Sequence, residues 1–198
     1  MEEQVASSKR WIAPVAIIAI VIVVIVIWFV GQRNALVRLE VTVDAAWSEV
    51  DNQLKRRSDL IPNLVATVQG IAGQEQAVFG DIADARARLA GATSVGETAD
   101  SYAELEGALS RLLVIVENYP ELRSNENFLR LQDELAGTEN RIAVARGRYN
   151  ETVRQFNTRI RVFPSSIAAN NMGLSAREFF EISDSDREVP TVDFGNNG

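Results

Sequence analysis

Two residue types that proteins use for much of their chemistry are missing from this chain. It contains no cysteine and no histidine in 198 residues. The absence of cysteine excludes disulfides, thiolate zinc sites, iron–sulfur clusters and a cysteine nucleophile. The absence of histidine removes the side chain that most often transfers protons near neutral pH, and with it Ser-His-Asp triads, HExxH zinc sites and ExxH di-iron sites.

Basic residues are outnumbered by acidic ones, at 20 against 27. The formal net charge is −7 and the sequence pI is about 4.8. This balance argues against a nucleic-acid partner recruited by bulk charge. The mean hydropathy of −0.03 is an average over two unlike parts, one of which is strongly apolar.

The apolar part is an uninterrupted run near the N-terminus. Every residue from Trp11 to Val30 except Pro14 is apolar. Twenty helical residues span about 30 Å, the thickness of the hydrocarbon core of a bilayer. A cleaved signal peptide is the alternative, but its apolar core is shorter and ends in small residues. This run is instead followed directly by large and polar residues, in the sequence Trp-Phe-Val-Gly-Gln-Arg. It therefore predicts a retained transmembrane helix.

The ends of this span carry the residues that anchor helices at membrane interfaces. Trp11 and Trp28 lie near its two ends, where their rings suit the headgroup level. Two basic residues flank each side: Lys9 and Arg10 before the span, Arg33 and Arg38 after it. We therefore expect a single-pass cell-membrane protein with an N-terminal anchor, and the positive-inside rule favours neither side for the remainder.

The rest of the chain shows the periodicity of long amphipathic helices. Apolar residues recur every three or four positions in three arms, at 33–72, 78–116 and 126–162. The first stripe has one gap, where Arg57 would lie on it, and Pro62 predicts a kink or break near residues 58–61. A short helix is expected after Ser165 or around 176–180. No segment alternates like a strand.

These patterns predict an all-α fold, in which a transmembrane helix is followed by an antiparallel bundle of three long arms plus a short C-terminal helix. The expected organisation is a short polar N-terminus at 1–10, the span at 11–30, the bundle at 33–182 and an acidic, flexible tail at 183–198. Within that tail, Asp184 to Glu188 resembles the start of a calcium loop. It fails at the sixth and twelfth positions, which are Val189 and Gly195. No metal or cofactor is expected.

Two groups of residues are candidates for interaction or for setting the register of the bundle. The first is Lys55, Arg56 and Arg57, the only basic triplet. A solvated face or ion pairs to a neighbouring arm explain it better than lipid contact, because it lies about 37 Å along the helix from Val30. The second is Tyr149-Asn150 with Phe156-Asn157, repeated at seven residues, followed by Phe163. This spacing places the aromatics on one face, beside asparagines that hydrogen-bond across the bundle. A small-molecule pocket lined by them is the alternative.

Three stretches resemble the LemA family of bacterial membrane proteins. They are residues 46–70, which contain LKRRSDLIPNL, residues 116–164, which end in YNETVRQFNTRIRVFP, and residues 179–194, FFEISDSDREVPTVDF. The resemblance implies an N-terminal single-pass anchor and a bundle of long antiparallel helices. It carries over no catalytic residue, because the family has no agreed biochemical activity.

We therefore predict a membrane-anchored helical-bundle scaffold or protein-interaction module of the bacterial cell envelope, and not an enzyme. The expected partners are the lipid bilayer and other membrane or envelope proteins, with a homo-oligomer as a further form. An alternative function is a sensor bundle that binds a small molecule between its helices. An enzyme would have to use carboxylates, Arg, Lys, Ser, Thr or Tyr alone.

Overall fold

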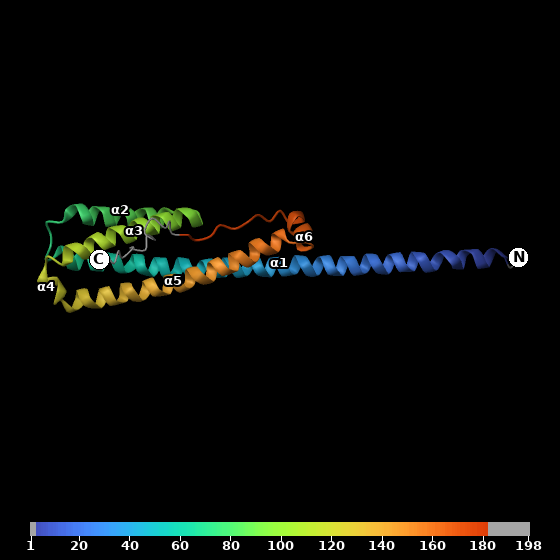
Figure 1. Cartoon of the computed structure of the whole chain (residues 1–198), viewed down its shortest axis with the longest axis horizontal. Coiled ribbons are helices and arrows are strands. Elements are labelled where there is room, and N and C mark those ends of the chain that lie inside the picture. Colours follow the sequence, from blue (N-terminus) through green and yellow to red (C-terminus); the bar gives the residue numbers. More distant parts are fainter. Residues whose placement is uncertain (1–2, 182–198) are drawn as a thin grey trace, which may run out of the picture. The chain divides into compact units, whose positions relative to one another are not determined.

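The computed structural model describes residues 3–181, with side chains from Pro14 onward. Its elements in chain order are the helices α1 (Glu3–Gln69), α2 (Gln76–Gly91), α3 (Val95–Val116), α4 (Pro120–Arg123), α5 (Glu126–Arg161) and α6 (Ser165–Asn171) (Figure 1). No strand occurs among residues 3–181, and the predicted all-α class is confirmed. The acidic tail at 183–198, with the segment Asp184 to Glu188, lies outside the described residues.

The described residues form two compact units. Unit 1 contains residues 3–48 and 151–177, and unit 2 contains residues 49–150 and 178–181. Helices α1 and α5 each contribute residues to both units. The boundary predicted between span and bundle at residues 30–33 falls inside the continuous helix α1.

Pro62 lies inside α1, which remains helical on both sides of it. Because proline has no backbone N–H, the carbonyl of Ser58 loses its intrahelical donor. Arg86 of α2 supplies a replacement, since its Nε donates to the Ser58 carbonyl at 3.0 Å and to Ser58 Oγ at 3.1 Å. A neighbouring helix thus satisfies the group that the proline leaves unpaired, and α1 continues unbroken.

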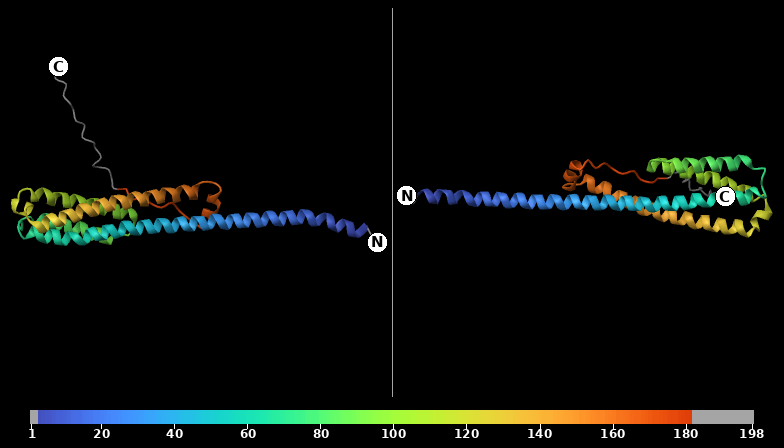
Figure 2. Two further views of the ribbon diagram at one scale, coloured as in Figure 1. Left: turned by 90° about the horizontal axis from the view of Figure 1, so that it is seen from below. Right: turned by 180° about the vertical axis from the view of Figure 1, so that it is seen from behind.

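The second predicted arm consists of two helices that fold back on each other. Helices α2 and α3 lie side by side (Figure 1 and Figure 2), and residues 92–94 connect them. Ser94 caps α3: its Oγ accepts from the N–H of Glu97, and the Glu97 carboxylate accepts from the N–H of Ser94. This reciprocal pair satisfies two of the free donors at the start of α3.

Five helices contribute to the core of unit 2, with α4 supplying Leu122 alone. The residues that fill it are the buried apolar positions of the predicted stripes, among them Ile61, Leu64 and Val68 of α1, Phe79 and Ile82 of α2, Leu105 and Leu112 of α3, and Phe128, Leu131 and Leu135 of α5. Burial of each such side chain contributes about 1.5–3 kcal/mol. Unit 2 is therefore a helical bundle held by one continuous apolar core.

Unit 1 has a smaller core made by α1, the end of α5 and α6. Its buried side chains are Leu36, Val43, Val153, Phe156, Ile160, Ala168 and Ala169. The short C-terminal helix is α6, so the first of the two predicted positions is confirmed. Residues 174–181, which include the second predicted position, are not helical.

Candidate functional site

The side chains of the apolar run in α1 are exposed from Pro14 to Trp28. Ile22, in the middle of the run, is 55% exposed, and the run contains an 18-residue window of mean hydropathy 3.1 with none of it buried. Burial begins with partial cover of Phe29 and Gln32 and is complete at Leu36. By length and composition, α1 is the only helix among the described residues that could cross a membrane. Trp28 is 39% exposed, whereas the side chain of Trp11 lies outside the described part.

Arg57 is the buried member of the basic triplet. It lies on the apolar stripe of α1, at the gap noted in the sequence, and is 6% exposed. Its Nη1 donates to the carbonyl of Leu135 at 2.8 Å and to Thr138 Oγ1 at 3.2 Å, both on α5. Lys55 and Arg56 are exposed. The three residues therefore have different environments, and Arg57 alone enters the core of unit 2.

Two carboxylates from other helices neutralise Arg57. Its Nη2 lies 2.6 Å from Glu106 Oε1 on α3, and its Nη1 lies 3.4 Å from Glu139 Oε2 on α5. Tyr102 of α3 donates its hydroxyl to the same Glu139 oxygen, and the Arg57 guanidinium lies 6.0 Å from the Tyr102 ring centroid. We call Arg57, Tyr102, Glu106 and Glu139 the Arg57 cluster. It joins α1, α3 and α5 through charge, hydrogen bonds and a cation–π contact.

Burial controls the protonation of this cluster. Desolvation raises the pKa of Glu106, and the nearby charge of Arg57 offsets this only in part. Burial also raises the pKa of the Tyr102 hydroxyl, an effect that the Glu106 carboxylate adds to. Arg57 Nε is buried and has no hydrogen-bond partner among residues 3–181. A buried charge of this kind favours one register of the helices over others, because a slipped register leaves it without its partners.

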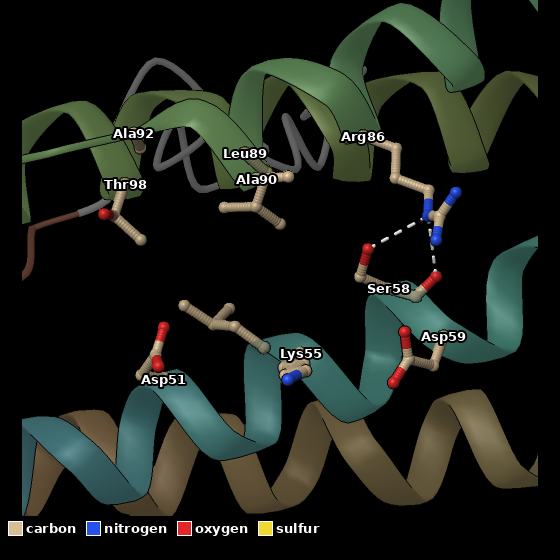
Figure 3. A pocket seen from close by; sticks show the side chains of 10 residues that line it. Asp51, Lys55, Ser58, Asp59, Arg86, Leu89, Ala90, Ala92 and Thr98 are labelled. Atoms are coloured by element: carbon tan, nitrogen blue, oxygen red, sulfur yellow. Dashed lines mark hydrogen bonds between the residues drawn. The ribbon is translucent and has the colours of Figure 1, made fainter.

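An open hollow of about 320 Å³ lies between α1 and the α2–α3 hairpin. Figure 3 shows Asp51, Lys55 and Asp59 on the α1 side, facing Arg86 and Leu89 on α2. None of Tyr149, Phe156 and Phe163 lines it. The polar side chains bring both signs of charge to its rim, and Arg86 is engaged with Ser58. The hollow could receive a small polar molecule, but it is not the aromatic pocket weighed from the sequence.

The two Tyr/Phe-Asn pairs of α5 hold the chain segment that follows α6. In unit 2, Asn150 donates from Nδ2 to the carbonyl of Phe180 at 3.1 Å and accepts from its N–H at 2.9 Å. The Tyr149 hydroxyl donates to the carbonyl of Glu178 at 2.8 Å. We call the Asn150–Phe180 pair the first asparagine clamp.

The same arrangement recurs in unit 1. Asn157 donates from Nδ2 to the carbonyl of Arg177 at 2.9 Å and accepts from its N–H at 2.8 Å, which makes the second asparagine clamp. Tyr149 and Phe156 are buried, as expected for core aromatics, whereas Phe163 is 80% exposed. The asparagines therefore bind backbone, not side chains of facing helices, and Phe163 does not continue the buried row.

Several residues of these sites carry no signal that the sequence could have revealed. Tyr102 and Glu106 belong to an acidic, periodic segment in which every carboxylate looks alike. Glu139 and Arg86 are equally ordinary in their local context. The one available signal was the gap in the α1 stripe, which marked Arg57 as a charge at a core position. Among residues 3–181, no group of three or more acidic side chains is placed to hold a metal ion.

The fold and the exposed run together define a class: a helical bundle with a candidate membrane anchor at its N-terminal end. Comparison with a family model identifies the family within this class. The LemA family model matches residues 46–194, and this protein belongs to the LemA family.

Relatives support the same placement. The chain is 25% identical over 173 residues to protein LemA of Metamycoplasma hominis, with 85% of this chain and 78% of the relative covered. It is 24% identical over 176 residues to magnetosome protein MamQ 1 of Paramagnetospirillum magneticum, covering 76% of this chain and 65% of that protein. It is 25% identical over 175 residues to MamQ of Magnetospirillum gryphiswaldense, covering 75% and 64%. The chain thus spans slightly less than two thirds of the MamQ proteins.

Proposed function

We propose that this protein is a non-catalytic scaffold that is anchored in the bacterial cell membrane and holds other membrane or envelope proteins through its helical bundle. The observation that carries the proposal is the composition of α1. The same continuous helix has an apolar run with no cover and, further along, an apolar stripe that is buried in both units. The candidate anchor and a stripe that builds the bundle thus belong to one helix.

Contact surfaces on the bundle are expected where apolar side chains are left exposed. In unit 2, Leu113 is 40% and Leu129 is 44% exposed, and both line one open hollow with Phe128. Val144 is a further exposed apolar residue on α5. Exposed apolar side chains that gather in one place are more typical of contact surfaces than isolated ones.

Photo-crosslinking in living cells tests the proposal at these positions. A photoreactive amino acid is placed singly at Leu113, Leu129 or Val144 of the full chain, with the exposed Asp133 as the matched polar control. We expect discrete adducts from at least one apolar position and none from Asp133, with mass spectrometry distinguishing a membrane or envelope partner from a second copy of the chain. No adduct at any position, together with a strictly monomeric protein in mild detergent, would contradict a scaffold.

The side of the membrane is open to direct measurement. Proteolysis of intact spheroplasts, followed with an antibody to the C-terminal residues, reports which compartment contains the bundle. Cleavage in intact spheroplasts places it outside the cytoplasm, and protection that is lost on lysis places it inside.

A second candidate function is the binding of a small polar ligand between helices. The hollow lined by Asp51, Lys55 and Arg86 favours it, because charges of both signs at its rim suit a zwitterion. A thermal-shift screen of the full chain in detergent with amino acids and other zwitterions tests this function. Stabilisation that is lost on Lys55→Ala would support it, whereas a screen without any shift would reject it.

A further inference from the structure

An apolar corner lies where α5 ends and α6 begins. Val162 is 44%, Phe163 is 80% and Ile167 is 53% exposed. In the same region α6 buries Ala168 and Ala169, while Ser165 Oγ donates to the carbonyl of Arg159 at 2.7 Å. The helix thus packs by its smallest residues and leaves its largest apolar side chain outside. We call Val162, Phe163 and Ile167 the apolar corner.

The apolar corner follows a stretch of α5 that contacts α1 just past its exposed run. Within unit 1, Arg159 Nη2 donates to Gln32 Oε1 at 2.8 Å, and Gln32 follows the run by two residues. Figures 1 and 2 show the end of α5 and α6 beside α1, with α5 antiparallel to it. Phe163 comes four residues after Arg159 and lies just past the end of α5 at Arg161.

The charges around the apolar corner are of one sign. Exposed arginines precede it in the sequence at Arg159 and Arg161 on α5, and two more, Arg33 and Arg38, follow the apolar run on α1. We call these four arginines the basic collar. No acidic residue occurs at positions 4–39 or 152–177, although the whole chain has a net charge of −7. A basic collar beside an apolar surface is the pattern that suits anionic lipid headgroups above a hydrocarbon layer.

We propose that the apolar corner is a second membrane contact, which enters the interfacial region of the leaflet beside the α1 span while the collar arginines bind anionic headgroups. The bilayer is the occupant that the structure favours, because the corner and the apolar run belong to one unit, and Arg159, shortly before the corner, contacts Gln32 two residues past the run. The inference rests on the anchor of the proposed function. Unit 1 would then be held to the membrane at two points, and not by the span alone.

The absence of cysteine makes a direct test simple. Single cysteines are introduced by Phe163→Cys and Ile167→Cys and labelled with an environment-sensitive fluorophore in the full chain. The protein is reconstituted in vesicles of phosphatidylcholine and phosphatidylglycerol at two to one, with quenchers attached along the lipid chains. Ile22→Cys in the span is the positive control. Asp133→Cys, at an exposed polar position of α5, is the aqueous control.

The proposal predicts blue-shifted emission at 163 and 167, and quenching by shallow lipid quenchers severalfold stronger than at 133. Emission at 163 and 167 that matches 133, with 22 deeply quenched, overturns the second contact and leaves the anchor intact. A label at 22 that is not quenched by lipid defeats the anchor and with it the proposed function. Labels shielded from water yet not quenched by lipid would place a protein on the corner, which also overturns the proposal.

A charge variant tests the collar separately. Arg161→Gln leaves the Arg159–Gln32 hydrogen bond in place. We expect it to reduce quenching at 163 in vesicles that contain phosphatidylglycerol and to have no effect in phosphatidylcholine alone. An equal reduction in both lipids, or none in either, would contradict binding of anionic headgroups.

Discussion

Arg57 illustrates how one charge can organise a core that is otherwise apolar. It occupies a position of the α1 stripe where the pattern calls for an aliphatic residue. Its counter-charges come from two other helices, Glu106 of α3 and Glu139 of α5. Both carboxylates are partly open to solvent, which moderates the cost of burying the ion pairs. The sequence marked the position as unusual, and the partners became visible only once three helices were brought together.

Substitution of Arg57 should be far more damaging than substitution of its neighbour. Arg57→Ala leaves Glu106 without its counter-charge and the Leu135 carbonyl without its donor, so we expect a loss of about 2–4 kcal/mol in the free energy of unfolding. Arg56→Ala, at an exposed position, should change it by less than about 0.5 kcal/mol. Urea unfolding of the full chain in mild detergent measures both, and equal effects would refute a structural role for the Arg57 cluster.

Glu106 should make stability depend on pH with a defined sign. Because burial raises its pKa in the folded protein, its contribution to stability is complete below its ordinary pKa of 4.5 and is lost as pH rises through the raised value. The unfolding free energy of the wild type relative to Glu106→Gln should therefore fall as the pH rises from about 4 to 7. Urea titrations at several pH values measure this difference.

Glu97 provides a control of opposite sign. Hydrogen bonds from the Thr93 N–H and hydroxyl and from the Ser94 N–H lower the pKa of its carboxylate. The contribution of Glu97 to stability is present above its ordinary pKa of 4.5 and is lost as the pH falls through the lowered pKa. Relative to Glu97→Gln, the wild type should gain stability as pH rises. Slopes of the same sign for both variants would contradict these assignments.

At the scale of elements, α1 shows how a helix passes through a proline with outside help. Pro62 removes the donor for the Ser58 carbonyl, and Arg86 replaces it from α2. The apolar stripe continues in phase after Pro62, with Leu64 and Val68 in the core. The identity of the replacement donor could not be predicted, because Arg86 lies 28 residues away in sequence.

A double-mutant cycle tests this compensation. Arg86→Met leaves the Ser58 carbonyl unsatisfied and should cost about 1–3 kcal/mol in the wild-type background. In a Pro62→Ala background the new N–H can pair with that carbonyl, so the same substitution should cost about 1 kcal/mol less. Urea unfolding of the four proteins gives the coupling energy, and strict additivity would show that Arg86 acts elsewhere.

The asparagine clamps should respond separately to substitution. Asn150→Ala removes both bonds to Phe180 and should speed hydrogen exchange of the Phe180 amide, whereas Asn157→Ala should act on the Arg177 amide. Asn150→Asp retains the acceptor and should preserve protection of Phe180 better than Asn150→Ala. Exchange measured by NMR distinguishes these cases. Identical loss of protection at both amides in either variant would indicate one clamp instead of two.

At the scale of the whole molecule, the chain divides its apolar residues between two environments. One set forms the run of α1 that nothing covers, and the other fills the cores of units 1 and 2. This division explains why the mean hydropathy of the whole chain is only −0.03, although that of the candidate span reaches 3.1. The LemA family match extends over residues 46–194 and does not include the span, so the anchor rests on composition and exposure.

The anchor can be tested by placing a charge inside and outside the run. Ile22→Arg puts a guanidinium at the centre of the span, which costs about 2.5–3.5 kcal/mol on insertion scales. We expect more of this variant to be released from membranes by alkaline carbonate. Val37→Arg, at an exposed position after the run, should be retained like the wild type. Equal retention of both variants would argue against a transmembrane span.

What the sequence determined by itself was everything that depends on local periodicity and composition. Apolar residues every three or four positions specify helices, and a long apolar run near the N-terminus predicts a candidate span. These signals were enough for the all-α class, for the third arm and for α6. The exclusion of cysteine and histidine chemistry likewise followed from the residue inventory alone.

Tertiary structure decided which polar residues meet. It paired Arg57 with Glu106 and Glu139, Arg86 with Ser58, and each asparagine with a backbone segment. It also left Phe163 exposed instead of bringing it into the core. The physical reason is range: helix formation depends on neighbours within one turn, whereas ion pairs and hydrogen bonds between helices join residues separated by tens of positions and exist only after the apolar stripes have packed.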